Sequence, residues 1–271
     1  MKSETYKFDI IVVAGQSNAE GNGIATTLEK YHNDNVFQLT ENSLTVYGYG
    51  LINYEKSDDF TVDFADYRKS SFRCTLDFSE TFAESYIKNG FLKQNRKILI
   101  VKAAVGGTGF SLGQWGVGNP LHERMKDMID SALALNPENK LVSFLWHQGE
   151  HDSFEQPELT PAAREEFYYN AFKQTANDIR NRYNVPNLPI IAGEMVNDWA
   201  DKFKEATSAV ENATKRVCGN IGHADVASSE GLSSNAQAVN WSADDIHFSA
   251  VALKELGKRY FDKYSEIINA E

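Results

Sequence analysis

Short apolar runs alternate with longer amphipathic stretches along most of this chain, and this alternation restricts its possible folds more than any other feature. The runs have the length and continuous apolar character of strands buried on both faces of a parallel sheet. They are Phe8–Ala14, Lys97–Ala103, Leu141–His147, Leu188–Gly193 and the weaker His223–Ala227. The stretches that separate or follow them have the periodicity of helices that cover such a sheet. They are Leu76–Lys88, Leu121–Leu135, Pro161–Tyr183, Ala200–Val217 and Ala250–Ile268. We therefore expect an α/β fold in which helices cover both faces of a parallel sheet.

The chain carries no obvious domain boundary. No repeat, low-complexity tract or Pro/Gly-rich linker divides its 271 residues, so we expect one domain over residues 1–271. Residues 21–72 fit the alternation poorly and are rich in Tyr, Asn, Asp and Gly. We interpret them as an irregular insertion near the site, with room for short strands. A long segment of this kind is often a binding loop, and a neutral surface insertion is the alternative.

The charge of the chain argues against two classes of partner. Its formal net charge is −11, whereas nucleic-acid binding needs a basic face. An anionic membrane surface is disfavoured for the same reason. The residues after Met1 lack the long apolar region of a secretory signal. We expect a cytoplasmic protein if Met1 is the natural start, and a secreted or periplasmic one if a signal peptide has been removed. The sequence predicts no oligomeric state.

The first chemically suggestive stretch, Gly15-Gln16-Ser17-Asn18, directly follows the first apolar run. Ligands and reacting groups gather at the carboxyl ends of strands in open α/β sheets. A serine on a tight turn there is exposed enough to act as a nucleophile, and its backbone N–H can serve as an oxyanion donor. The alternative is that Ser17 or Asn18 merely caps a helix.

Two further loops follow later apolar runs. Gly106-Gly107-Thr108 follows the second run, and its paired glycines let the backbone approach a ligand closely. A glycine turn without function is the alternative here. The stretch from Trp146 to Asp152 follows the third run, and its density of polar residues is hard to explain by packing. Its Gln148 amide can point at an oxyanion, and Glu150 can brace neighbouring loops. A metal site at His147 and His151 is the alternative, but their spacing suits ligation only in a helix.

The fourth stretch, Asp244-Asp245-Ile246-His247, precedes the last helix. Histidine is the usual general base near neutral pH, and an aspartate three residues earlier can fold back onto its Nδ1–H. Asp244 has that spacing, and Asp245 is the alternative acid. In the competing interpretation, one of these aspartates caps the last helix and His247 lies on its surface.

Together these four stretches resemble the conserved blocks of the SGNH hydrolase superfamily, and they occur in the same order. More narrowly, they resemble its sialate O-acetylesterase and acetylxylan esterase branch, carbohydrate esterase family six. Gln16 and Gln148 stand where the wider superfamily has an aspartate and an asparagine, which favours the narrower branch. The resemblance implies a three-layer α/β/α sandwich, similar to flavodoxin, with a short central parallel sheet.

The resemblance also assigns residue roles. It implies that Ser17 is the nucleophile, His247 the base and Asp244 its orienting acid. The oxyanion donors would be the backbone N–H groups of Ser17 and Gly107 and the side-chain amide of Gln148. The supporting or substrate-binding residues expected around them are Gln16, Asn18, Gly106, Thr108, Glu150 and Trp241.

We therefore expect a serine esterase that removes O-acetyl groups from a carbohydrate through an acetyl-enzyme on Ser17. Its partner is an acetylated saccharide, and the chemistry requires neither a metal nor an organic cofactor. Two alternatives remain at this point. One is a catalytically inactive carbohydrate-binding module on the same fold, because fold does not imply function. The other is an SGNH lipase or thioesterase, although no long apolar lid segment is visible.

Overall fold

A seven-stranded sheet lies at the centre of the molecule, with strand order β12-β11-β10-β1-β9-β3-β6. The computed structural model describes residues 6–27, 30–41, 45–47, 51–53, 60–69, 74–154 and 158–270. Neighbouring strands run parallel, except that β6 pairs antiparallel with β3. The strands are β1 (Lys7–Gly15), β3 (Val36–Glu41), β6 (Phe60–Phe64), β9 (Arg96–Lys102), β10 (Lys140–His147), β11 (Ile190–Gly193) and β12 (Ala224–Ala227).

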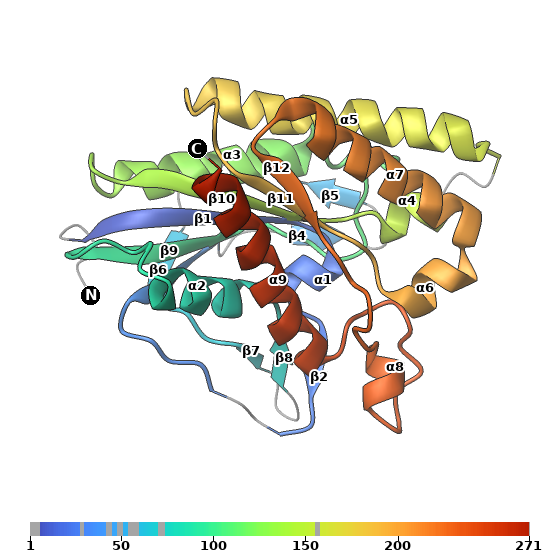
Figure 1. Ribbon diagram of the computed structural model, residues 1–271, viewed down its shortest axis with the longest axis horizontal. Helices are drawn as coiled ribbons and strands as arrows, with labels where there is room; N and C mark the ends of the chain where they lie inside the picture. The colour runs from blue at the N-terminus through green and yellow to red at the C-terminus, as the bar shows by residue number, and fades with distance from the viewer. Residues whose placement is uncertain are drawn as a thin grey trace.

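Helices cover both faces of this sheet, which gives a three-layer α/β/α arrangement (Figure 1). One layer contains α3 (Pro120–Ala134), α5 (Pro161–Arg182) and α7 (Lys204–Ile221), and the other contains α2 (Ser79–Lys88) and α9 (Ala250–Asn269). The short helices are α1 (Ser17–Glu20), α4 (Glu150–Phe154), α6 (Asn197–Lys202) and α8 (Asn235–Ala238). Two small sheets complete the fold, β2 (Gly23–Ala25) with β8 (Cys74–Leu76) and β7 (Arg68–Lys69), and β4 (Thr45–Tyr47) with β5 (Leu51–Asn53). The expected α/β architecture is confirmed.

All five predicted strands are present in the sheet, and four of the five predicted helices agree with the structure to within three residues at each end. The exception is the predicted helix Ala200–Val217. Phe203 leaves helical geometry, with φ −120° and ψ 42°, and separates α6 from α7. The amphipathic pattern continues across this break, so periodicity alone does not reveal it.

Residues 21–72 contribute more to the sheet than their composition indicates. Their strands β3 and β6 extend it beyond β9, and β2 and β7 belong to one of the small sheets. Residues 28–29, 42–44, 48–50, 54–59 and 70–72 lie outside the described part of the chain. The role of this segment as a binding loop therefore stays a prediction, as does the expectation of a single domain.

After its first residue, Lys7, the central strand β1 is fully buried, and it is apolar apart from the carboxylate of Asp9. Asp9 is completely buried, and its Oδ1 lies 2.5 Å from Nε of Arg96 while its Oδ2 accepts from the Tyr86 hydroxyl at 2.9 Å. A buried charge is tolerated when it is paired in this way. These contacts of Asp9 hold the strand at its amino end, and the site lies at the opposite, carboxyl end.

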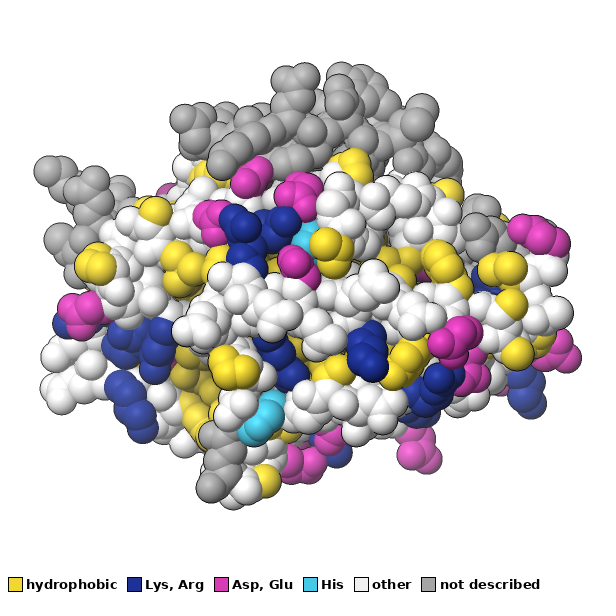
Figure 2. Space-filling view, turned by 90° about the horizontal axis from the view of Figure 1, so that it is seen from above, with side chains coloured by type: hydrophobic (Ala, Val, Ile, Leu, Met, Phe, Trp, Pro, Cys, Tyr) yellow, Lys and Arg dark blue, Asp and Glu magenta, His cyan; other side chains and the backbone are white. Residues whose placement is uncertain are grey.

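Basic and acidic side chains are interspersed on the face seen in Figure 2. Arg216 of α7 pairs with Glu165 of α5 at 2.6 Å, and Arg182 of α5 pairs with Asp130 of α3 at 2.6 Å. Exposed pairs of this kind each contribute about 0–1 kcal/mol to stability. None of the helices in the described ranges combines the length and apolar character needed to cross a bilayer.

Gly15 joins the ends of β1 and β10. Its φ is +126°, and a Cβ atom there would lie 2.0 Å from the carbonyl oxygen of His147. That same oxygen accepts from the backbone N–H of Gln16 at 2.9 Å, so it cannot move away without weakening this hydrogen bond. A glycine at this position is therefore required both by backbone conformation and by space.

We expect Gly15→Ala to lower the free energy of unfolding by at least about 3 kcal/mol. Gly90→Ala is the matched control, because Gly90 also has positive φ (+77°) but has open space around its Cβ position. That substitution should cost only about 1–2 kcal/mol. Urea denaturation of both variants measures the difference. Equal losses would show that the contact with His147 is unimportant.

Candidate active site

A cavity of about 450 Å³ opens at the carboxyl edge of the sheet, beyond the ends of β1, β9 and β10. Six predicted site residues line it: Gln16, Ser17, Gly106, Gly107, Glu150 and His247. His151, considered above only as an alternative metal ligand, also lines the cavity, and five residues that were not predicted complete the lining: Glu20, Asn22, Phe154, Trp199 and Ile246. The predicted loops therefore do meet at one place. The cause is the parallel arrangement, which brings successive strand ends to the same edge.

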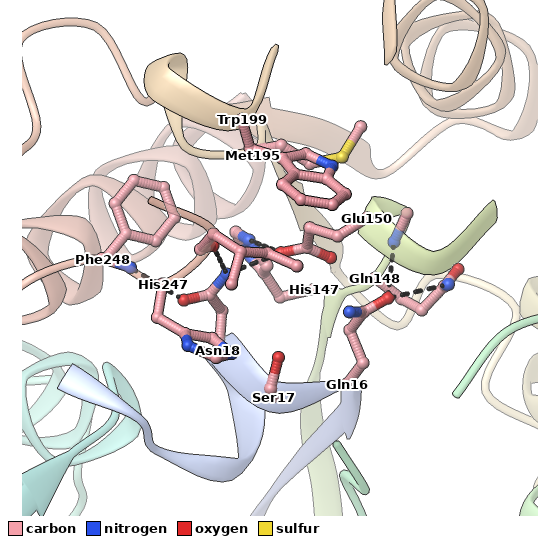
Figure 3. A network of polar contacts seen from close by, with 12 residues as sticks. Gln16, Ser17, Asn18, His147, Gln148, Glu150, Met195, Trp199, His247 and Phe248 are labelled. Atoms are coloured by element: carbon pink, nitrogen blue, oxygen red, sulfur yellow. Dashed lines mark hydrogen bonds and ion pairs between the residues drawn. The ribbon is translucent and has the colours of Figure 1, made fainter. Parts of the chain in front are cut away.

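Ser17 is the first residue of α1, directly after the turn that follows β1. Its backbone N–H therefore has no acceptor within the helix. The side chain projects from the start of α1 toward the space beside His247 (Figure 3). A Cβ atom at Gly106 would lie 3.4 Å from the Ser17 Cβ, so the second loop packs directly against the serine.

His247 is oriented by Asp244. Its Nδ1 lies 2.8 Å from Asp244 Oδ2, and its backbone N–H donates to Asp244 Oδ1 at 3.2 Å. Asn235 also donates to Asp244 Oδ2, at 2.9 Å. Burial acts to raise the pKa of the Asp244 carboxyl, but the hydrogen bonds from His247 and Asn235 outweigh it and hold that pKa below its usual range. The ionised carboxylate keeps the proton of His247 on Nδ1 and leaves Nε2 as an acceptor.

The alternative acid, Asp245, is engaged elsewhere. Its Oδ2 lies 3.1 Å from Nζ of Lys202, in a half-exposed ion pair on the surface. Neither aspartate caps the last helix, because Ser249 is the N-cap of α9 and accepts from the N–H of Ala252. The helix-cap interpretation of these two aspartates is therefore wrong.

Asn18 links three elements of the site. Its Nδ2 donates to Glu150 Oε1 at 2.6 Å and to the carbonyl of Ile246 at 3.1 Å, and its Oδ1 accepts from the N–H of Phe248 at 3.0 Å. Glu150 is fully buried, and burial raises the pKa of its carboxyl above the ordinary range, against the hydrogen bonds it accepts. The network ties α1 and α4 to both sides of His247 (Figure 3).

The glycine loop after β9 is held by α1 and by its own threonine. The N–H of Gly106 donates to Glu20 Oε2 at 2.9 Å, and the other oxygen of Glu20 pairs with Arg68 at 2.8 Å. Gly107 has φ +69° and lines the cavity. Thr108 is buried, where its hydroxyl donates to the carbonyl of Val105 and accepts from Nε1 of Trp115. Thr108 thus shapes the loop from inside.

Gln148 lies behind the cavity and does not line it. Its amide nitrogen is directed to Asp152 Oδ2 at 2.7 Å, Gln16 Oε1 at 3.1 Å and the carbonyl of Thr108 at 3.2 Å. Asp152 in turn accepts from the backbone N–H groups of Phe110 and Ser111. The loop after β10 is therefore rigidly joined to the loop after β9.

The histidines of this loop are not arranged as metal ligands. His147 ends β10, whereas His151 lies in α4, so the two do not share a helical face. His147 Nδ1 contacts the hydroxyl of Tyr260 at 2.9 Å, and burial lowers the pKa of His147 to about 3, which keeps it neutral. Over the described ranges of the chain, no three His, Cys, Asp or Glu side chains are grouped to hold a metal ion.

The tryptophan at the cavity is not the predicted one. Trp241 is 69% exposed and lies outside the lining, so its contact with a sugar stays a prediction. Trp199 of α6 lines the cavity instead, next to Phe154, and its Nε1 donates to the hydroxyl of Ser153. Trp199 follows β11, so the rule that places site residues at strand ends could have found it. Glu20 lies two residues after the first stretch, at the end of α1, and could have been found in the same way.

This chain is similar to known proteins over nearly its whole length. A family model described as "Carbohydrate esterase, sialic acid-specific acetylesterase" matches residues 7–266. Over 149 residues the chain is 26% identical to a protein of Escherichia coli (strain K12) named "Probable 9-O-acetyl-N-acetylneuraminic acid deacetylase", and the match covers 48% of this chain and 46% of that protein. A probable carbohydrate esterase of Arabidopsis thaliana is 30% identical over 122 residues, 44% of this chain and 43% of that protein. The matched stretches thus span less than half the length of either curated relative.

The fold is shared over a greater length. The crystal structure of NanS superposes with a TM-score of 0.70 at 18% identity, covering 98% of this chain and 99% of that one. At this identity the likeness shows the fold alone, whereas the family match extends over nearly all of the sequence. The resemblance seen in the four sequence blocks is confirmed: the chain belongs to the family of sialic acid-specific acetylesterases among the carbohydrate esterases.

Proposed function

We propose that this protein is a serine esterase that removes O-acetyl groups from a carbohydrate through an acetyl-enzyme on Ser17. The observation that carries the proposal is the placement of Ser17 and of an Asp244-oriented His247 in one cavity. Ser17 and His247 are not hydrogen-bonded to each other in this structure. Such bonds are often long in the absence of substrate and tighten when it binds.

In the proposed mechanism, Ser17 Oγ attacks the acetyl carbonyl carbon while His247 Nε2 takes the hydroxyl proton. Asp244 stabilises the imidazolium that forms. The negative charge on the carbonyl oxygen is held by the backbone N–H groups of Ser17 and Gly107. His247 then protonates the departing sugar oxygen as its bond to the acetyl carbon breaks. Water attacks the acetyl-enzyme by the same sequence and releases acetate, and no step requires a metal or an organic cofactor.

The cavity suits a sugar ester of modest size. A volume of about 450 Å³ lies in the range of small-molecule sites, and Phe154 and Trp199 offer apolar surface beside polar side chains. The E. coli relative is named for 9-O-acetyl-N-acetylneuraminic acid, so an O-acetylated sialic acid is the first natural substrate to test. The family match supports a carbohydrate ester over the lipase and thioesterase alternatives.

We expect the protein to hydrolyse p-nitrophenyl acetate and 9-O-acetyl-N-acetylneuraminic acid. We expect only weak hydrolysis of p-nitrophenyl octanoate. A serine-reactive organophosphate should leave one adduct, on Ser17, located by mass spectrometry. Faster hydrolysis of the octanoate ester would favour a lipase. Absence of both hydrolysis and adduct would favour the inactive binding module.

A further inference from the structure

The side-chain amide of Gln16 is held in one orientation by the loop after β10. Its Oε1 accepts from the backbone N–H groups of His151 at 3.2 Å and Gly149 at 3.4 Å, and from Nε2 of Gln148 at 3.1 Å. A backbone N–H can only donate, so the atom that faces these two groups must be the amide oxygen. The amide nitrogen of Gln16 is therefore forced to the opposite side.

That opposite side is the cavity. Gln16 lines the cavity beside Ser17, and Figure 3 shows its amide nitrogen turned toward the space above the Ser17 hydroxyl. Within the part of the chain that the structure describes, this nitrogen has no acceptor. It is also not among the fully buried atoms that lack a partner, so it is not sealed away from the cavity. Both of its hydrogens are consequently available to a ligand in the cavity.

Gln148 is placed the other way round. Its amide nitrogen carries two hydrogens, and three acceptors already face them: a carboxylate oxygen of Asp152, Oε1 of Gln16 and the carbonyl of Thr108. The shortest of these contacts, 2.7 Å, is made to the carboxylate. Hydrogen bonds to a charged partner are the strong ones, so turning this amide into the cavity would require breaking its best contact.

We propose that the Gln16 side-chain amide is the third oxyanion donor, and that Gln148 is a positioning residue that holds it. This inference rests on the esterase function proposed above. An oxyanion donor acts best when it is oriented before the reaction, because no reorganisation is then needed as charge develops. The three N–H groups on Gln16 Oε1 provide that orientation, and they also draw electron density from the amide, which strengthens its N–H groups as donors.

The sharpest test is Gln16→Glu, which keeps the shape of the side chain. One carboxylate oxygen can still accept from the N–H groups of Gly149 and His151, whereas the other replaces a donor with a negative charge. We expect kcat for p-nitrophenyl acetate to fall by about 10²–10³ or more, with a smaller change in KM. Gln16→Met, which is neutral and lacks the donor, should lose a similar factor. The reactive Ser17 in each sample is titrated with the organophosphate, and each rate is divided by that concentration, so that unfolded protein does not contribute.

Gln148→Met is the matched comparison. The two backbone donors still hold Gln16 in this variant, so we expect it to lose less than about tenfold in kcat. Loss of a donor should also reduce the preference for p-nitrophenyl acetate over p-nitrophenyl thionoacetate, because sulfur accepts hydrogen bonds poorly. This preference should shrink in both Gln16 variants and persist in Gln148→Met.

The outcomes separate the two proposals. If the wild type is active and both Gln16 variants stay within tenfold of it, the assignment of Gln16 is overturned and the esterase function stands. If Gln148→Met shows the larger loss and the changed thionoester preference, the role returns to Gln148. If the wild type shows neither hydrolysis nor an adduct on Ser17, the proposed function fails and this assignment falls with it.

Discussion

Replacing Ser17 with alanine is expected to lower kcat for p-nitrophenyl acetate by about 10⁴–10⁶ while leaving the fold intact. Loss of a serine nucleophile in a triad removes the covalent route, and only the binding and oxyanion contributions remain. The serine hydroxyl has no hydrogen-bond partner within the described structure, so its removal leaves no buried group unsatisfied. Steady-state kinetics measure the loss, and thermal melting followed by circular dichroism measures the stability.

Ser143→Ala is the matched control for this prediction. Ser143 lies in β10, and its buried hydroxyl also lacks a partner, but it does not line the cavity. We expect wild-type kcat and near-wild-type stability for this variant. Near-wild-type hydrolysis by Ser17→Ala, with the organophosphate adduct on another residue, would contradict the assignment of the nucleophile.

The second large effect is expected at Asp244. In Asp244→Asn the amide offers its NH₂ group to His247 Nδ1, which favours the tautomer that carries the proton on Nε2. That tautomer cannot accept the serine proton, and the comparable change in a serine protease lowers kcat by about 10⁴. We expect a loss of this order, measured as kcat for p-nitrophenyl acetate at a pH where His247 is neutral in the wild type.

Asp245→Asn provides the comparison, because it removes only a half-exposed pair with Lys202. Such pairs contribute about 0–1 kcal/mol to stability, and we expect kcat to stay within roughly threefold of wild type. If Asp245→Asn is the more damaging of the two substitutions, the orienting acid is Asp245 and the contact between Asp244 and His247 is structural only.

The strands and their ends were predictable because burial on both faces leaves a clear mark on composition. β1, β9 and β10 are continuous apolar runs, and parallel pairing brings the loops that follow them to one edge. β3 and β6 were not predicted. They lie at the far edge of the sheet and mix polar with apolar residues, as in Val-Phe-Gln-Leu-Thr-Glu of β3, so no apolar run distinguishes them.

The contact between Asp244 and His247 was also predictable, because three residues separate them and local geometry suffices to bring the side chains together. The partner of Asp245 was not predictable, since Lys202 is 43 residues away in the chain. Likewise, its place after β11 makes Trp199 a candidate, but the sequence does not decide that Trp199 lines the cavity while Trp241 is exposed to solvent. Trp199 lies at the cavity because α6, which carries it, packs there.

The sequence by itself determined the order of the strands along the chain, the edge at which the loops meet and the residue types available there, because these follow from burial patterns and local spacing. Only the tertiary structure decided which glutamine lines the cavity. Gln16 and Gln148 have the same donors and acceptors, and both follow buried strands. Their opposite orientations are set by different groups: the N–H groups of Gly149 and His151, from another loop, for Gln16, and the carboxylate of Asp152, four residues later in the same stretch, for Gln148. The hydrogen bonds that orient Gln16 form only when the sheet brings the two loops together, so the sequence alone contains no local signal for them.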